Sequence, residues 1–309
     1  MAKYSIVTPV FNEEKVIPEL YLTLEKVMAE VNGDYELIFV NDGSTDNSGK
    51  LIEKLCSKNS KVKSLDFSKN FGHQIAISAG LDYATGDAVV IIDADMQDPP
   101  EVILEMIKKW KEGYEIVYGK RIKRKGETFF KRITAYCFYR FFRSMTDHDI
   151  PLDSGDFRLI DRKVCENIQK LKEKSRYMRG LISWAGFKQT YVEYVREERF
   201  AGETKYPLGK MLRFAIDAIT SFSYKPLRLA TYLGFTLSLV SFLYLLIVVY
   251  QRLFTNTTIT GWTSVVALNL FFYGIILIIL GIIGEYIGRI YEETKNRPLY
   301  VLRDKIGFD

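Results

Sequence analysis

The chain has 309 residues, enough for one large domain and a smaller part, and its formal net charge is +5. The cysteines Cys56, Cys137 and Cys165 lie far apart without metal-ligand spacing, which argues against a zinc site or a disulfide framework and favours reduced thiols. An apolar run begins almost at the first residue, so we expect no cleavable signal peptide.

Strand-like and helix-like patterns alternate from residue 4 to residue 119. Apolar runs predict strands at 4–10, 35–41, 62–67, 87–93 and 115–118, with helices at 14–31, 46–58, 73–83 and 101–112. Four β-α units with nearly continuous apolar strands predict an α/β domain whose parallel sheet is covered on both faces. The sequence has neither a GxGxxG nor a Walker A motif, so nothing favours dinucleotide or P-loop chemistry.

The fourth strand runs directly into the acidic loop Asp93-Ala94-Asp95-Met96-Gln97-Asp98-Pro99-Pro100. These carboxylates and the amide cannot pack in a core, and open α/β sheets bind their ligands at such strand ends. Oxygen ligands at alternate positions suit Mg²⁺ or Mn²⁺. A solvated acidic turn is the alternative, and so short a motif does not exclude it.

Two other strand ends carry polar loops, at 8–14 and 40–46. Ser44 or Asp46 would cap the following helix, and Asn41-Asp42-Gly43 would turn the chain. Carboxylates or amides at three strand ends on one rim exceed what caps require, so they predict a polar pocket.

Residues 120–143 contain nine Lys or Arg residues and a single acid, Glu127. On a helical wheel of 127–145 the arginines fall on one arc and aromatic residues lie opposite, which predicts an amphipathic helix in the membrane interface. A surface helix packed on the domain is the alternative, and nucleic-acid binding is a weaker one. A second amphipathic candidate covers 207–228.

Two uncharged stretches predict transmembrane helices at 229–251 and 262–284. Each has the roughly 20 residues that a bilayer core requires, and neither has the polar face of a helix in a soluble core. Lys and Arg residues flank their outer ends, whereas the loop 252–261 has only Arg252 at its edge. We therefore expect a plasma (inner) membrane protein with a cytoplasmic domain at 1–206, a cytoplasmic tail at 285–309 and both termini inside.

Six motifs stand in an order that resembles family 2 glycosyltransferases, specifically the polyprenyl-phosphate branch with dolichol-phosphate mannose synthase and the bactoprenol glucosyltransferases. The resemblance covers the whole chain, including the two apolar C-terminal stretches. The motifs are Thr8-Pro9-Val10-Phe11-Asn12-Glu13-Glu14, Val40-Asn41-Asp42-Gly43-Ser44, Asn70-Phe71-Gly72-His73, the Asp93–Pro100 loop, Ser154-Gly155-Asp156-Phe157-Arg158 and Arg199-Phe200-Ala201-Gly202-Glu203-Thr204-Lys205-Tyr206.

The resemblance implies a GT-A-type, Rossmann-like domain that uses a nucleotide sugar with Mg²⁺ or Mn²⁺. It implies that Asp156 lies beside the acceptor and that Asp156 and Asp95 are catalytic residues. The donor-binding residues that it implies are Pro9, Asn12, Glu13, Asp42, Asp93, Arg199 and Lys205, and the metal ligands are Asp93, Asp95 and Gln97. For Arg199, a surface ion pair with Glu197 or Glu203 is the alternative.

The processive members of the family carry a Gln-x-x-Arg-Trp motif, which this sequence lacks, so we expect one sugar per acceptor. A lipid monophosphate has a second pKa of about 6 and is already an anionic nucleophile, so Asp156 need not carry out the whole deprotonation. Such an acceptor needs nearby cations, for which Arg121, Lys131 and Arg132 are the candidates.

Attack of the phosphate on the anomeric carbon would invert its configuration. The expected function is thus metal-dependent, inverting transfer of one hexose, with UDP-glucose as the expected donor, to undecaprenyl phosphate for modification of a cell-envelope glycan. GDP-mannose as donor and a catalytically silent nucleotide-sugar-binding protein are the alternatives. A transporter is disfavoured because the two spans have almost no polar residues. We expect no nucleic-acid partner, and a homo-oligomer stays open.

Overall fold

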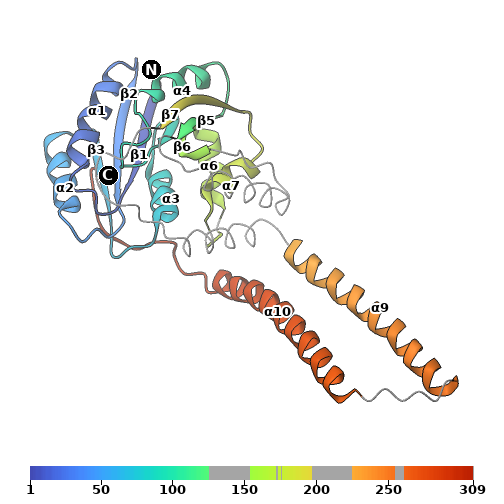
Figure 1. The fold of residues 1–309 in the computed structure, drawn as a ribbon. Helices are drawn as coiled ribbons and strands as arrows, with labels where there is room; N and C mark the ends of the chain where they lie inside the picture. Colours follow the sequence, from blue (N-terminus) through green and yellow to red (C-terminus); the bar gives the residue numbers. More distant parts are fainter. Residues whose placement is uncertain (125–153, 172, 175, 197–224, 255–260, 309) are drawn as a thin grey trace. The chain divides into compact units, whose positions relative to one another are not determined.

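The computed structural model describes residues 1–124, 154–171, 173–174, 176–196, 225–254 and 261–308 (Figure 1). The described residues form two compact units. The first takes in 1–124, the described part of 154–196, and 297–308, whereas the second takes in 225–254 and 261–296.

The first unit begins with the predicted β-α alternation. Its elements are β1 (Lys3–Val10), α1 (Ile17–Ala29), β2 (Asp34–Asn41), α2 (Ser48–Lys58), β3 (Val62–Phe67), α3 (His73–Tyr83), β4 (Ala88–Ile91), α4 (Val102–Lys111) and β5 (Ile116–Arg124). β1 pairs in parallel with β2 and with β4, and β2 pairs in parallel with β3. The α/β class is therefore confirmed, and each strand and helix predicted up to residue 119 is present.

The rest of the unit makes the sheet mixed rather than parallel throughout. It adds β6 (Ser154–Asp161), α6 (Arg162–Lys170), α7 (Met178–Trp184), β7 (Gln189–Arg196) and β8 (Leu302–Ile306). The strand order is β7-β5-β6-β4-β1-β2-β3-β8. β6 lies antiparallel between β4 and β5, and β8 lies antiparallel to β3. These two strands fall outside the β-α alternation, and the sequence pattern predicted neither of them.

The central strands have few exposed side chains because helices cover them. All four residues of β4 are buried, as are the last seven of β1. α3 packs against β1 at Gly80, where a Cβ atom would collide with the side chain of Val7. This packing buries the strands and leaves their carboxyl ends, with the polar loops that follow, as the accessible rim.

The last strand comes from the far end of the chain. Tyr300 stacks on Phe67 with ring centroids 5.2 Å apart, and its hydroxyl donates to Asp82 at 2.9 Å. Arg303 lies 3.6 Å from Asp66 of β3. No strand was predicted here, because three of the five residues of β8 are charged and look like a solvated tail. Pairing with the sheet edge outweighs that local composition.

The second unit contains α9 (Lys225–Phe254) and α10 (Trp262–Thr294). Each contains a stretch that is long and apolar enough to cross a membrane, Lys225–Tyr244 in the first and Phe271–Thr294 in the second. The predicted spans 229–251 and 262–284 fall within these two helices. The predicted amphipathic helix 127–145, and 207–224 of the second one, lie outside the described residues.

A buried carboxylate on β2 holds the opposite end of the sheet together. Glu36, 2% exposed, accepts hydrogen bonds from the Ser5 hydroxyl at 2.6 Å and the Thr85 backbone at 2.7 Å, and Lys63 lies 2.8 Å away. Burial alone would raise the pKa of Glu36, but Lys63 and these hydrogen bonds lower it to about 2 from an ordinary value of 4.5. The charged form therefore stabilises the fold.

We expect Glu36→Gln to reduce the free energy of unfolding by about 3 kcal/mol at pH 7. Because the folded-state pKa is the lower one, this contribution is present above pH 4.5 and is lost as the pH falls towards 2. Thermal unfolding in detergent at pH 7 and at pH 3 measures it, with Glu53→Gln on the exposed face of α2 as the matched control. A Glu36→Gln loss no larger than that of the control would contradict this role.

Candidate active site

Strand register places two acidic residues opposite each other at the rim. β4 and β6 run antiparallel, and Ile91 pairs with Arg158. Followed for two further residues along each chain, this register brings Asp93 opposite Asp156. The acidic loop after β4 and the acid of β6 thus belong to one site, although the 62 residues 94–155 separate Asp93 from Asp156 in sequence.

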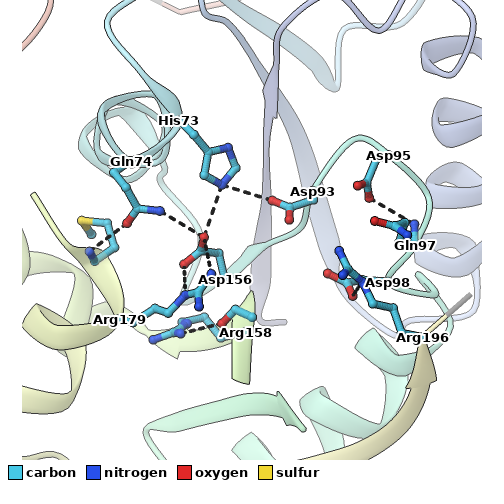
Figure 2. Close-up of polar contacts among 12 residues, drawn as sticks. His73, Gln74, Asp93, Asp95, Gln97, Asp98, Asp156, Arg158, Arg179 and Arg196 are labelled. Atoms are coloured by element: carbon cyan, nitrogen blue, oxygen red, sulfur yellow. Dashed lines mark hydrogen bonds and ion pairs between the residues drawn. The ribbon is translucent and has the colours of Figure 1, made fainter. Parts of the chain in front are cut away.

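His73, the first residue of α3, lies between these two carboxylates (Figure 2). Its Nε2 atom is 3.3 Å from Asp93 Oδ1 and 3.3 Å from Asp156 Oδ2. Burial alone would lower the pKa of His73, but the charges of Asp93 and Asp156 raise it well above 6.5. The two carboxylates therefore favour the protonated form of the imidazole.

Asp156 is held from a second side by α7 and by the residue after His73. Arg179 donates from Nε to Oδ1 at 2.8 Å and from Nη2 to Oδ2 at 3.2 Å, and Gln74 donates to Oδ2 at 3.0 Å. The side-chain amide oxygen of Gln74, Oε1, in turn accepts the backbone N–H of Met178 at 2.9 Å. Burial would raise the pKa of Asp156, but Arg179 and His73 hold it well below 3.8. The result is a fixed carboxylate that is a weak base.

The chemistry of Asp93 and Asp95 suits the binding of a divalent cation, because two neighbouring carboxylates repel each other and both supply oxygen ligands. Asp93 Oδ1 is buried and forms no hydrogen bond with the described residues, although it forms an ion pair with His73 Nε2 at 3.3 Å. Burial and the charge of Asp93 raise the pKa of Asp95, whose Oδ1 accepts the backbone N–H of Gln97 at 3.2 Å. In the described part of the chain no three His, Cys, Asp or Glu side chains form a ready-made cation site. Mg²⁺ does not require such a cluster of three protein ligands, because it binds proteins through one or two carboxylates and takes its other ligands from substrate phosphates and water.

The third acid of the loop, Asp98, is fully buried in a different cluster. The Tyr194 hydroxyl donates to Asp98, while Arg121 Nη2 lies 3.4 Å from it and Arg196 Nε lies 3.8 Å from it. Arg121 also lies against the backbone of Gly155, next to Asp156. This predicted acceptor cation is therefore at the site, but it also neutralises a buried carboxylate.

The loops predicted to bind the nucleotide sugar are joined to each other by hydrogen bonds. Asn12 Oδ1 accepts the backbone N–H of Thr45 at 2.8 Å, and the Glu13 backbone donates to Ser48 at 2.9 Å. These contacts join the loop after β1 to the loop after β2. Pro9 lies within β1, paired with Val40.

Asp42 is 3% exposed and accepts hydrogen bonds from the backbone N–H groups of Phe71 and Gly72 and from the side chain of Asn70. Gly43, at φ 65°, lies so close to the backbone of the Asn70 segment that a Cβ atom would collide with it. Asp42 thus fixes the loop that leads into His73. Its predicted contact with the nucleotide stays a prediction.

Sequence reasoning and structure overlap only partly at this site. The structure brings Asp93 and Asp156 together and sets Asp95 and Gln97 on the adjoining loop (Figure 2). The structure adds three side chains to which the sequence analysis assigned no role. His73 was noted only as part of a motif, and no sequence pattern pointed to Gln74 or Arg179. The predicted residues Lys131, Arg132, Arg199 and Lys205 lie outside the described residues.

Comparison with known proteins places this site in a family. Residues 5–169 match the family described as Glycosyl transferase family 2. The uncharacterized glycosyltransferase YkcC of Bacillus subtilis (strain 168) is 61% identical, with 99% of this chain and 95% of that protein covered. The prophage bactoprenol glucosyl transferase homolog of Escherichia coli (strain K12) is 42% identical, with 97% and 98% covered.

The chain is also similar to a phage protein and, at lower identity, to a protein of solved structure. The bactoprenol glucosyl transferase of Shigella phage SfV is 42% identical over 98% of this chain and 99% of its own. The crystal structure of glucosyl-3-phosphoglycerate synthase from Mycobacterium tuberculosis, in complex with Mn²⁺, UDP and glucosyl-3-phosphoglycerate, has 20% identity and a TM-score of 0.49, covering 71% of this chain and 78% of that one. The family match, together with the relatives that are similar over nearly their full length, shows that the chain belongs to glycosyl transferase family 2 and is a glycosyltransferase.

Proposed function

We propose that the enzyme transfers one hexose, with inversion, from a nucleotide sugar to a polyprenyl phosphate at the cytoplasmic face of the membrane. The observation that carries this proposal is the similarity over nearly the whole chain, both apolar helices included, to relatives named for glucosyl transfer to bactoprenol. Those names favour UDP-glucose as the donor and undecaprenyl phosphate as the acceptor, and a cell-envelope glycan as the destination.

The donor side of the proposed site is the rim formed by the loops after β1, β2 and β4. Asp93 and Asp95 would hold Mg²⁺ or Mn²⁺, because their oxygens are the ligands these cations prefer and one of them lacks a hydrogen bond. When bound, the cation supplies positive charge to the diphosphate leaving group. Arg199 and Lys205, from the motif beyond β7, are the proposed further contacts to the diphosphate.

The acceptor side is proposed at Asp156 and Arg121. A phosphate oxygen of the lipid attacks the anomeric carbon, the new carbon–oxygen bond forms as the bond to the nucleotide diphosphate breaks, and the diphosphate leaves with the electron pair. Any proton that the lipid phosphate still carries passes to water or to Asp156. Because the second pKa of a phosphate monoester is about 6, most acceptor molecules carry no such proton at neutral pH. Arg121, with Lys131 and Arg132, would offset the charge of the acceptor.

The membrane assignment rests on α9 and α10. Their apolar stretches are almost entirely unburied within the chain, unlike the core helix of a soluble protein. Seven residues, 295–301, separate the end of α10 from β8, which belongs to the catalytic sheet. Seven residues reach roughly 25 Å when extended, less than the roughly 30 Å of a bilayer core. This short connection supports the proposal that the end of α10 lies on the cytoplasmic side of the membrane and the loop between the helices on the other.

This orientation predicts which engineered cysteine a membrane-impermeant maleimide reaches. In a variant with Cys56, Cys137 and Cys165 replaced by alanine, Thr258→Cys in the loop between the helices should react in intact cells. Lys54→Cys, on the exposed face of α2, should react only after the membrane is permeabilised. Labelling of Lys54→Cys in intact cells would reverse the proposed topology.

The function is tested by incubating the purified full chain with undecaprenyl phosphate and a panel of labelled nucleotide sugars that includes UDP-glucose and GDP-mannose. We expect label in the lipid fraction, highest with UDP-glucose. Transfer from GDP-mannose instead would keep the reaction class and change the donor. Nucleotide-sugar binding without transfer from any donor would favour the alternative of a silent binding protein.

A further inference from the structure

The segment that follows α10 in the chain contacts both elements that bound one loop of the site. Residues 297–308 supply β8, which pairs with β3 at the edge of the sheet. The same segment reaches α3, because the Tyr300 hydroxyl donates to Asp82 at 2.9 Å. Since the loop 68–72 connects β3 to α3, the segment holds the elements on either side of it.

The segment contacts this loop directly at Ser68 and, through Phe67, at Phe71. The backbone N–H of Ser68 donates to the carbonyl of Val301 at 3.0 Å. Tyr300 stacks on the buried Phe67 with ring centroids 5.2 Å apart, and Phe67 meets the Phe71 ring edge-on at 5.6 Å. Loss of the Tyr300 ring would therefore remove a contact that supports Phe67 and, through it, Phe71.

The other side of the loop holds Asp42, the residue that the family resemblance places at the nucleotide. Its carboxylate accepts the backbone N–H of Phe71 at 2.7 Å and that of Gly72 at 3.0 Å. Gly43, the next residue, lies so close to the loop that a Cβ atom there would come within 2.4 Å of the Lys69 backbone. The position of the Asp42 carboxylate and the position of the loop therefore depend on each other.

A purely structural role for the segment would be to cover the edge of β3, and the β8 ladder does that without Tyr300. An uncovered sheet edge invites pairing with other chains, and the backbone of Leu302–Ile306 covers this one. Tyr300 precedes the strand, so its ring and hydroxyl contacts are not part of the ladder. These contacts join β3 to α3 beside the start of the loop, which covering an edge does not require.

We propose that Tyr300 is a positioning residue for the nucleotide pocket, which acts on Asp42 through the two phenylalanine rings that it supports. The inference rests on the proposed function for the identity of the ligand, a nucleotide sugar, whereas the contacts themselves do not depend on it. Because Asp42 is expected beside the base or the ribose, away from the anomeric carbon, its displacement weakens donor binding and leaves the chemical step largely intact. A residue that follows the second apolar helix in the chain thus completes the donor pocket.

The test compares three substitutions of Tyr300 in the full chain. Tyr300→Ala removes the ring, Tyr300→Leu keeps apolar bulk without the aromatic stack, and Tyr300→Phe keeps the stack and loses the hydrogen bond to Asp82. Lys305→Ala is the matched control, because Lys305 is an exposed residue of β8 in the same segment. Isothermal titration calorimetry measures the affinity for UDP and for GDP, and transfer assays give kcat and the KM values for UDP-glucose and undecaprenyl phosphate. Thermal unfolding verifies that each variant is folded.

We expect Tyr300→Ala to bind the nucleotide that wild type prefers about tenfold more weakly, which is the upper range of what an aromatic pair contributes to an equilibrium. The KM for the donor should rise by a similar factor, while kcat and the KM for undecaprenyl phosphate should stay within about twofold of wild type. In this variant the backbone amides of Phe71 and Gly72 should exchange their hydrogens faster. Tyr300→Leu should fall between Tyr300→Ala and wild type, whereas Tyr300→Phe and Lys305→Ala should remain close to wild type.

Unchanged nucleotide affinity in the folded alanine or leucine variant would overturn the proposal. An equal rise in the KM for the donor and for the lipid phosphate would also overturn it, because that result indicates general damage to the fold and not a displaced Asp42. Failure of the proposed function would look different. In that case wild type would transfer no sugar to undecaprenyl phosphate, while the nucleotide affinities and the amide exchange of the variants would still decide the role of Tyr300.

Discussion

Asp95→Ala is expected to abolish sugar transfer, and EDTA is expected to stop the wild-type enzyme until Mg²⁺ or Mn²⁺ is added back. The leaving diphosphate carries the charge that develops during transfer, and Asp93 and Asp95 are the carboxylates at the strand end that suit a divalent cation. Transfer of labelled sugar to lipid phosphate measures the effect. A loss of at least about 10³-fold in kcat/KM corresponds to about 4 kcal/mol of transition-state stabilisation.

Glu101→Gln is the matched control for this result. Glu101 is an exposed acid just after the same loop, at the start of α4, and its removal changes the net charge by the same amount. It should leave transfer within about twofold of wild type, as is usual for an exposed surface charge. Full activity of the wild type in excess chelator would exclude a divalent cation from the reaction.

Asp156→Asn is expected to reduce kcat about 10²-fold at pH 6, and only part of this loss should be recovered at pH 8. Arg179 and His73 hold the pKa of Asp156 well below 3.8, so the carboxylate is a weak base. The acceptor phosphate also loses its last proton at a pKa of about 6 without help. The geometry therefore favours a role in holding the acceptor or the sugar over a role as general base.

The pH profile of kcat for wild type and Asp156→Asn separates these two roles. A general base would be needed at pH 6 and nearly dispensable at pH 8, so a large recovery between them would show that proton removal dominates. A nearly parallel pair of profiles would support positioning. Wild-type turnover of the variant across the range would remove Asp156 from the mechanism.

The alternation of apolar strands with amphipathic helices predicted β1 to β5 and their helices, because each of these elements is a local pattern. The sheet edges were not predictable in this way. β6 pairs with β4 over a long sequence separation, and β8 adds a charged segment from the far end of the chain to β3. Pairing partners at that distance are decided by the assembled sheet and leave no periodic signal.

The candidate site shows the same division. The acidic loop after β4 was predictable because carboxylates cannot pack in a core and strand ends bind ligands. That Asp93 faces Asp156 depends on the β4–β6 register, and the contact of His73 with both depends on where α3 begins. Arg121 shows the reverse case: its sequence context indicated a free cation, whereas it lies 3.4 Å from the buried Asp98.

The central claim is that a lipid phosphate is the nucleophile and receives one sugar. Mass spectrometry of the lipid product tests it most directly, using the purified full chain, UDP-glucose, Mg²⁺ and either undecaprenyl phosphate or undecaprenol lacking the phosphate. We predict a product with a single hexose, β-linked through the phosphate, formed only from undecaprenyl phosphate. Several hexoses per lipid, an α-linked product, or equal transfer to undecaprenol would contradict the proposed reaction.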